Sequence, residues 1–383
     1  ENIILNRMRK TLSIAAAALC AAAAEATSLS SLPFHGRLES DTMSVERMQE
    51  VVVSAVRAPK NAPFAVANIE RRELDAFAKT GQELPFLFAR TPGVMAWGEN
   101  GLGTGTTYLR IRGAGDSRIN VTIDGVPLNS PEDQCVFWAN MNSYAALLGS
   151  VQIQRGVGTS TNGDGAFGGT VSLQTRAPQL RPGGEVTASG GSFGTWCVGG
   201  RASTGLLWNH LVIDGAYNET HTDGFVHGTA GRSGSYYAGL TWMGNAVTVR
   251  YKNIGNFERT GQAWNGVIAG DYDGYAPINA DYDELYRMGY GRLNSLVEHI
   301  YADDNGELVA EPYRMKDGTV WRRTTDNFRQ NHNILSFAWD ISPHWSTTAS
   351  THYTHGYGYY AEFKYNNKLA KYGLPAFTKA DGN

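Results

Sequence analysis

The residue types that could do chemistry are spread along this 383-residue chain and form no recognisable catalytic or metal-binding pattern. The nine histidines show no ligand spacing, and Cys135 and Cys197 lie far apart in the sequence. Metal sites and disulfide frameworks depend on regular spacings of such residues. We therefore predict no catalytic residue, no metal and no cofactor. We expect Cys135 and Cys197 to be unpaired, with a single disulfide as the alternative.

Two glycine-rich stretches, Gly101–Gly105 and Gly163–Gly169, have the composition of a phosphate-binding loop but not its surroundings. Such a loop follows a strand, precedes a helix and usually contains a lysine. These glycines are better explained as turn residues, because glycine reaches backbone conformations that other residues avoid. The net charge of −3 also lacks the basic footprint of a nucleic-acid-binding protein, so no nucleic acid is expected as a partner.

The N-terminal segment has the three parts of a secretory signal peptide. Met8-Arg9-Lys10 supplies positive charge, Leu12–Ala24 is apolar, and Ala24-Glu25-Ala26 places small residues around a cleavage position. The apolar run is shorter than the roughly 20 residues of a membrane-spanning helix, which argues against a membrane anchor. Lipidation at Cys20 is a further alternative. We predict that residues 8–26 are removed on export.

A mixed α/β domain is expected over residues 56–176, after a flexible segment, 27–55, that ends in the β-branched run Glu50–Ala55. Helices are predicted at Glu70–Lys79 and Leu84–Arg90, and Thr91-Pro92-Gly93 gives a stop signal for the second. Period-2 alternation predicts four short strands, at Leu109–Ile111, Ile119–Ile123, Val151–Ile153 and Val171–Leu173.

After Pro182 the chain alternates between apolar and polar residues in seven segments. They are Glu185–Gly191, Trp196–Thr204, Asn209–Glu219, Ser235–Met243, Ala246–Gly255, Asn331–Ile341 and Trp345–Gly356. Tight connections at 205–208, 244–245 and 342–344 alternate with long ones at 220–234 and 256–330. Aromatic residues lie in or near the strand ends, namely Trp208, Tyr217, Trp242, Tyr251, Trp339, Trp345 and Tyr353. Sorted turns and aromatic girdles are typical of a transmembrane β-barrel. By composition alone, a soluble all-β protein remains the alternative.

The order of these segments resembles the TonB-dependent outer-membrane receptors. The matching stretches follow the family's order over roughly 50–175: Glu50–Ala55, Thr91–Val94, Ile111-Arg112-Gly113, Asn120–Leu128, Val151–Gly156 and Gly165–Val171. The resemblance implies a mixed α/β plug domain, residues 56–176, followed by an antiparallel transmembrane β-barrel, residues 177–383. The family's barrel has about 22 strands. Only about seven are visible in this sequence. We therefore expect a whole plug and an incomplete barrel.

The resemblance also assigns roles to particular residues. The TonB box, Glu50, Val51, Val52, Val53, Ser54 and Ala55, is expected to bind the periplasmic C-terminal domain of TonB by strand addition. Arg110, Arg112 and Arg155 are candidates for an ion-pair lock between plug and barrel, since buried arginines need carboxylate partners. Ordinary salt bridges within their own domain are the alternative. The plug signature residues are Gly113, Asp124, Gly125, Gly156, Gly168 and Gly169. Ligand-vestibule residues are expected in external loops, at His221, Asp223, Trp264, Tyr272 and Tyr275.

The function that the resemblance implies is active import across the bacterial outer membrane, without enzymatic activity. The ligand would be scarce and small, such as a ferric siderophore, haem or cobalamin, and outer-membrane lipid would surround the barrel. A SusC-like glycan importer is the alternative within transport. Such importers usually carry an extra N-terminal domain, and only Thr27–Met48 separates the predicted cleavage site from the TonB box. An outer-membrane barrel enzyme is the alternative from another class, but it has no use for a plug.

Overall fold

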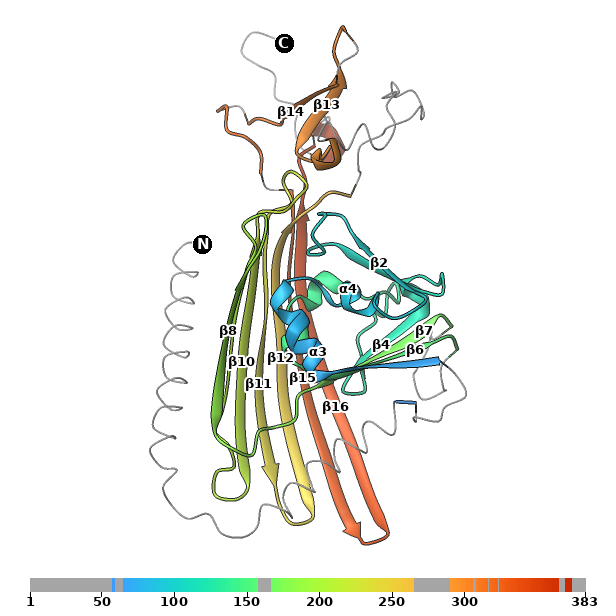
Figure 1. Ribbon diagram of the computed structural model, residues 1–383, viewed down its shortest axis with the longest axis vertical. Helices are drawn as coiled ribbons and strands as arrows, with labels where there is room; N and C mark the ends of the chain where they lie inside the picture. The colour runs from blue at the N-terminus through green and yellow to red at the C-terminus, as the bar shows by residue number, and fades with distance from the viewer. Residues whose placement is uncertain are drawn as a thin grey trace.

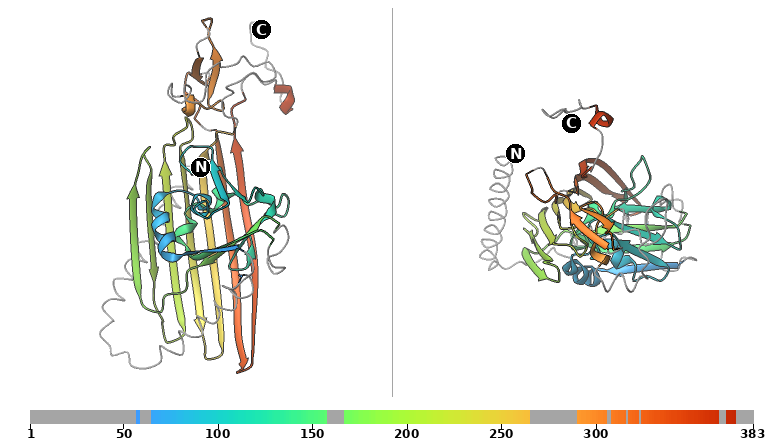
Figure 2. Two further views of the ribbon diagram at one scale, coloured as in Figure 1. Left: turned by 45° about the vertical axis from the view of Figure 1, so that its right-hand side comes forward. Right: turned by 90° about the horizontal axis from the view of Figure 1, so that it is seen from above.

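The computed structural model describes residues 57–58, 65–157, 167–264, 290–305, 308–315, 317–322, 324–364 and 369–373. These residues form an N-terminal α/β domain and a seven-stranded antiparallel sheet, and the domain packs against one face of that sheet (Figures 1 and 2). The predicted signal peptide, residues 8–26, and the predicted TonB box, Glu50–Ala55, lie outside the described residues.

The N-terminal domain is built on a five-stranded sheet in the order β1-β6-β7-β4-β5. Its strands are β1 (Ala65–Glu70), β4 (Ile119–Ile123), β5 (Val126–Pro127), β6 (Leu148–Arg155) and β7 (Gly169–Thr175). Strands β4 and β7 run parallel, and the other neighbours run antiparallel. A separate hairpin joins β2 (Val94–Gly98) to β3 (Thr107–Ile111). The four strands expected from period-2 alternation are confirmed as β3, β4, β6 and β7.

Both predicted helices are confirmed within a few residues of their expected ends. They are α3 (Arg71–Phe77), which continues as the 3-10 turn η1 (Ala78–Thr80), and α4 (Leu84–Phe88). Three further 3-10 turns are η2 (Asp116–Arg118), η3 (Trp138–Met141) and η4 (Tyr144–Ala146). Gly81 ends η1 with a φ of 75°, a conformation that favours glycine. Phe77, Leu87 and Phe88 are buried, so the two helices cover one side of the domain's core.

The larger sheet has the order β16-β15-β12-β11-β10-β9-β8. Its strands are β8 (Gly183–Gly190), β9 (Trp196–Ser203), β10 (Leu211–Thr222), β11 (Gly231–Met243), β12 (Val247–Gly261), β15 (Thr325–Ser342) and β16 (Trp345–Ala361). All seven predicted strands are confirmed in their predicted order. Several extend farther than predicted, so the long connections at 220–234 and 256–330 shrink to 223–230 and 262–324. In these extensions the strands still pair through main-chain hydrogen bonds, although the alternation of apolar and polar residues has ended.

The connections are sorted between the two ends of the sheet (Figure 1). One end carries the short turns 204–210, 244–246 and 343–344. The other end carries 191–195, 223–230 and the long connection 262–324. That connection contains η6 (Tyr290–Arg292) and an unpredicted hairpin of β13 (Glu298–Ala302) and β14 (Leu308–Pro312), and η7 (Leu369–Tyr372) follows β16. Among the described residues, no helix is both long enough and apolar enough to cross a membrane.

The sheet has an inner face, which meets the N-terminal domain, and an outer face, which does not. On β12 the buried residues Thr248, Arg250 and Lys252 belong to the inner face. Val249 and Tyr251 alternate with them on the outer face, opposite Phe337 and Leu335 of β15. The predicted division of these side chains between two faces is therefore confirmed.

Four of the exposed tryptophans lie at the short-turn end of the sheet. Trp208 lies in a turn there, and Trp242, Trp339 and Trp345 lie at the adjoining strand ends. Tyr217, which was also predicted to lie near a strand end, instead lies well inside β10, because that strand continues to Thr222.

Candidate functional site

The N-terminal domain and the inner face of the sheet share one apolar core. Ile254 of β12 and Ile334 of β15 are fully buried among residues of the domain, including Trp138 and Tyr144. Burying apolar surface favours association of the domain with the sheet, but the hydrophobic effect is non-directional and does not set their relative position. Polar contacts must therefore fix the position of the domain on the sheet.

Asp124 provides the most buried of these polar contacts. Asp124 and Gly125 both have positive φ, 49° and 82°, and form the two-residue turn between β4 and β5, where Asp-Gly is favoured. Asp124 Oδ2 accepts hydrogen bonds from Thr175 Oγ1 at 2.7 Å and from Lys252 Nζ at 2.6 Å, and Oδ1 accepts one from the Thr175 N–H at 3.0 Å. The Asp124 and Lys252 side chains are 8% and 5% exposed. One carboxylate thus connects a turn, β7 and the larger sheet.

The surroundings of the Asp124 carboxyl group favour its charged form. Burial opposes ionisation of Asp124, but the Lys252 ammonium and its hydrogen bond outweigh burial and hold the pKa of the carboxyl below its usual value. A second buried cation, Arg250, donates to the Arg176 carbonyl oxygen at 2.7 Å and to Tyr237 Oη at 3.0 Å. Two cations on the inner face of β12 therefore bind the domain. Lys252 contacts Asp124, and Arg250 contacts Arg176, which directly follows β7.

The arginines predicted to form the interdomain lock do not do so in the described structure. Arg110 is exposed and lies over the Trp97 ring at 5.4 Å. Arg112 occupies a turn with a φ of 51°, and Arg155 donates to the Pro92 carbonyl oxygen at 2.6 Å. None of the three has a carboxylate within ion-pair distance among the described residues. The interdomain ion pair found there has the opposite polarity, with the carboxylate on the domain and the cation on the sheet.

The predicted signature glycines either have positive φ or lie where the chain approaches a neighbouring segment closely. Gly113 and Gly156 have positive φ, 82° and 99°. A Cβ at Gly169 would lie 2.6 Å from the Gln154 carbonyl oxygen, and one at Gly168 would collide with Ala114. Any side chain at the last two positions would push β7 away from its neighbours.

The chain enters the domain through a dense set of hydrogen bonds just after the predicted TonB box. Arg57 Nη1 donates to Ser150 Oγ at 2.9 Å, and Nη2 donates to the Ser172 carbonyl oxygen at 2.9 Å. The Ala58 N–H donates to Gln152 Oε1 at 2.7 Å, and Gln152 Nε2 donates back to the Ala58 carbonyl oxygen at 3.1 Å. A pull on the preceding segment would therefore act directly on β6 and β7. Sequence reasoning missed Arg57, because its partners lie about a hundred residues away.

Glu83 is a fully buried carboxyl group in front of α4. The Thr107 hydroxyl donates to its Oε2, and no hydrogen-bond partner for Oε1 occurs among the described residues. Burial raises the pKa of Glu83 to about 8. The group is therefore protonated at neutral pH, in contrast to Asp124.

The β2–β3 hairpin presents an aromatic and cationic surface. Trp97 stacks on Tyr108 at 5.2 Å between ring centroids, Arg110 lies over the Trp97 ring, and Trp97 remains 38% exposed. Tyr108 Oη donates to Glu99 Oε1 at 2.6 Å. Figure 1 places β2 at the end of the domain nearest the long connections of the sheet. Stacking rings beside a guanidinium suit a planar or anionic ligand.

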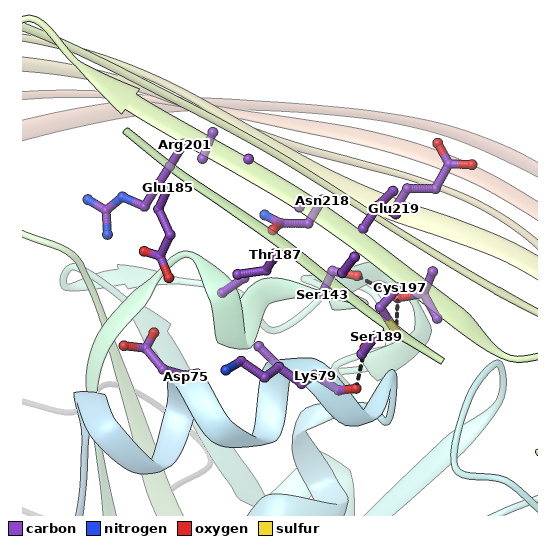
Figure 3. Close-up of a pocket in the computed structure, with 18 of the residues that line it drawn as sticks. Asp75, Lys79, Ser143, Glu185, Thr187, Ser189, Cys197, Arg201, Asn218 and Glu219 are labelled. Carbon is purple, nitrogen blue, oxygen red and sulfur yellow. Dashed lines mark hydrogen bonds between the residues drawn. The ribbon is translucent and has the colours of Figure 1, made fainter. Parts of the chain in front are cut away.

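A small cavity of about 80 Å³ lies between the domain and the sheet (Figure 3). Asp75 and Lys79 line it from α3 and η1, and Glu185, Arg201 and Asn218 line it from β8, β9 and β10. Ligand sites for small molecules usually exceed about 300 Å³. This cavity is too small for such a ligand, and it marks a place where the domain and the sheet are not closely packed.

The predicted vestibule residues do not gather in one place. His221 lies within β10 and stacks on Trp196, on the outer face, because β10 extends beyond its predicted end. Asp223 is exposed at the start of the 223–230 connection, and Trp264 packs edge-on against Tyr360. Tyr272 and Tyr275 lie outside the described residues.

No group of three or more His, Cys, Asp or Glu side chains is arranged to hold a metal ion in the part of the chain that the structure describes. Cys135 and Cys197 are free thiols. Residues 190–194 read Gly-Gly-Ser-Phe-Gly, the spacing of a serine nucleophile elbow. They join two antiparallel strands, however, whereas that elbow joins a strand to a helix. The stretch therefore lacks the structural setting of that elbow.

Comparisons with known proteins find one matching family model and several similar solved structures. Residues 58–170 match the family model described as TonB-dependent Receptor Plug Domain. The ferric-catecholate import receptor Fiu of E. coli K12 is similar in structure, with a TM-score of 0.57 and 13% identity over 80% of this chain and 40% of that one. FpvA of P. aeruginosa, bound to heterologous pyoverdines, gives 0.54 and 15% over 82% and 46%. The ferric citrate transporter FecA gives 0.55 and 17% over 86% and 43%. No curated protein sequence matches the chain. The chain shares the fold of these structures and spans less than half the length of each.

Proposed function

Because the chain carries a TonB-dependent receptor plug domain at residues 58–170, joined to a partial antiparallel barrel sheet, we propose that it belongs to an active importer of the bacterial outer membrane. The importer takes up a scarce small ligand and has no enzymatic activity. The signal peptide, residues 8–26, directs export and is cleaved. TonB drives transport through the segment Glu50–Ala55.

The observation that carries this proposal is the docking of the plug domain on the inner face of the sheet through Asp124 and Lys252. A domain in that position blocks the inner side of a barrel, so a ligand passes only when the domain moves. The outer membrane holds no ATP and no sustained ion gradient, so the work must come from a protein partner. The hydrogen bonds of Arg57 supply a point where a pull on Glu50–Ala55 reaches β6 and β7.

The ligand is proposed to be a metal chelate with anionic or aromatic groups. Trp97, Tyr108 and Arg110 provide stacking surface and positive charge at the end of the plug nearest the long connections. Structurally similar proteins are described as a ferric-catecholate import receptor, a protein bound to heterologous pyoverdines and a ferric citrate transporter. A ferric siderophore is therefore the first choice, with haem and cobalamin next.

The proposal is tested by separating ligand binding from uptake in cells. Val52→Pro removes a main-chain donor and fixes φ in the segment that TonB would pair with, and Val52→Ala is its matched control. Ferric catecholate, ferric citrate, haem and cobalamin, each radiolabelled, are offered in turn. We expect one of them to bind equally well to all three proteins, and only Val52→Pro to abolish its accumulation. Normal accumulation with Val52→Pro would refute energy coupling through this segment. Failure of all four ligands to bind would refute the chelate proposal.

A further inference from the structure

The formally charged residues on the outer face of the large sheet lie close together. Above the level of Trp339, alternation along the strands puts only four such residues on this face: Glu219 of β10, Arg232 of β11, Arg259 of β12 and Arg329 of β15. The other charged residues of these strands at that height, such as Arg250, Lys252 and Glu258, lie on the inner face. We call Arg232, Arg259 and Arg329 the outer arginine cluster.

The register of the sheet brings these arginines together. Arg232 is directly opposite Arg259 across β11 and β12. Arg259 is opposite Asn327 on β15, so Arg329 is its diagonal neighbour. Side chains directly opposite each other have Cβ atoms about 5 Å apart, and diagonal neighbours are about 7–8 Å apart. Like charges in such positions repel, so this arrangement costs stability unless an anion joins them.

Only one of the three arginines has an anionic partner among the described residues. Glu219 accepts from Arg232 Nε at 2.5 Å and from Nη2 at 3.0 Å, and Tyr217 Oη donates to Glu219 Oε2 at 2.7 Å. Arg259 and Arg329 are exposed and have no carboxylate within ion-pair distance in that part of the chain. The cluster therefore has three positive charges against one negative charge.

The distance of the cluster from the tryptophans at the short-turn end indicates which part of a membrane it would contact. Val247, opposite Trp339, marks the tryptophan level at the short-turn end, and Arg259 lies twelve residues farther along β12. At about 3.3 Å per residue and a tilt of roughly 40°, that distance projects to about 30 Å. The apolar band of an outer-membrane barrel is about 25 Å tall. Arg329, opposite Phe257, is ten residues from that level, or about 25 Å. The arginines thus lie at or just beyond the edge of the hydrocarbon, at the end that carries the long connections.

Aromatic side chains surround the cluster, as expected at a membrane interface. Arg232 lies over the Phe257 ring at 5.8 Å, and Phe257 stacks on Tyr217 at 6.1 Å between centroids. Tyr357 of β16 is directly opposite Arg329. This setting matches the headgroup region of a membrane, where aromatic rings and cations lie between the apolar acyl chains and the charged headgroups.

We propose that the outer arginine cluster binds the phosphate groups of a lipid in the outer leaflet, with Arg259 and Arg329 as the principal contacts. The guanidinium group is the side chain best matched to phosphate, because it offers two parallel donors and keeps its charge. A phosphate between Arg259 and its neighbours would replace their repulsion with attraction. This inference rests on the outer-membrane placement proposed above. The occupant is a phosphorylated glycolipid of that leaflet.

The test measures binding of lipid A with two phosphates to the protein purified from outer membranes and washed free of lipid in detergent. We expect Arg259→Gln/Arg329→Gln to weaken binding about tenfold or more, since a hydrogen bond to a charged group contributes about 1.5–3 kcal/mol. Arg72→Gln/Arg314→Gln removes two exposed charges away from the cluster and should bind as the unaltered protein does. Lipid A without phosphates should bind at least tenfold more weakly to the unaltered protein. Millimolar inorganic phosphate should compete poorly.

Equal affinity of the cluster variant and the unaltered protein would overturn the proposal, as would equal binding of dephosphorylated lipid A. Efficient competition by inorganic phosphate would show a simple anion site and would also overturn it. Membrane fractionation and ligand uptake on the same variants separate this inference from the proposed function. Absence of the protein from the outer membrane refutes the function itself. Normal uptake without a lipid difference refutes only the lipid site.

Discussion

Replacing Lys252 by methionine would leave the Asp124 carboxylate buried without its cation. The two side chains are 5% and 8% exposed and 2.6 Å apart, so solvent screens the pair only weakly. Removing one partner of a buried pair costs about 3–5 kcal/mol. The two hydrogen bonds from Thr175 remain, which favours the lower end of that range. A cost of about 3 kcal/mol corresponds to an approximately hundredfold increase in opening of the plug from the sheet.

Hydrogen exchange measures this opening without requiring transport. The Phe225 and Val226 N–H groups donate to the Asn100 carbonyl oxygen of the N-terminal domain at 3.3 Å, so peptides covering residues 223–230 report on the separation of the domain from the sheet. We expect their protected amides to exchange about a hundredfold faster in Lys252→Met. Asp124→Asn/Lys252→Met should recover much of the protection, because both charges are then gone. Lys371→Met, which removes an exposed lysine outside the contact between the domain and the sheet, is the control.

The dependence of this protection on pH follows from the direction of the Asp124 shift. Since the pKa of Asp124 is lowered in the folded protein, its contribution is fully present above the unfolded pKa of about 4. That contribution is lost only as the pH falls through the lower, folded value. After correction for intrinsic exchange rates, the part of the protection that Asp124 contributes should therefore be constant from pH 5 to 8. Exchange in Lys252→Met within threefold of the unaltered protein would refute the assignment of Asp124 and Lys252 as the contact that holds the plug.

Three other predictions concern residues of the plug. Burial raises the pKa of Glu83 to about 8, so the folded plug keeps a proton that the unfolded chain releases. Stability in urea should therefore fall between about pH 5 and 8, by up to about 1.4 kcal/mol per pH unit, and Glu83→Gln should remove that slope; an unchanged slope would contradict this. Gly169→Ala should lower the stability of the plug by about 1–3 kcal/mol, because its Cβ would meet the Gln154 carbonyl oxygen, whereas Gly183→Ala meets no atom within 4 Å and should be neutral. Arg57→Ala should reduce uptake while ligand binding stays unchanged, and equal uptake would exclude Arg57 as the point where a pull enters the plug.

The sequence alone determined the elements whose signal is local. Alternation such as Val247–Thr248–Val249–Arg250 is set by the side-chain period of a strand, so both the strand and the division of its faces could be predicted. Asp124-Gly125 likewise carries a local turn signal, because few residues tolerate positive φ. The ends of strands were less predictable. Pairing continues beyond Gly255 on β12 through main-chain bonds that need no apolar side chain.

Only the tertiary structure decided which charged residues meet. Asp124 and Lys252 are 128 positions apart, and Arg57 reaches Ser172 over 115 positions. No local pattern distinguishes these residues from Arg110, Arg112 and Arg155, which looked equally able to form a lock. The outer arginine cluster depends in the same way on register, because a shift of one residue between β11 and β12 would move Arg259 from the side of Arg232 to the opposite face. Contacts between distant segments arise from the docking of whole sheets, and a sequence read one segment at a time does not contain them.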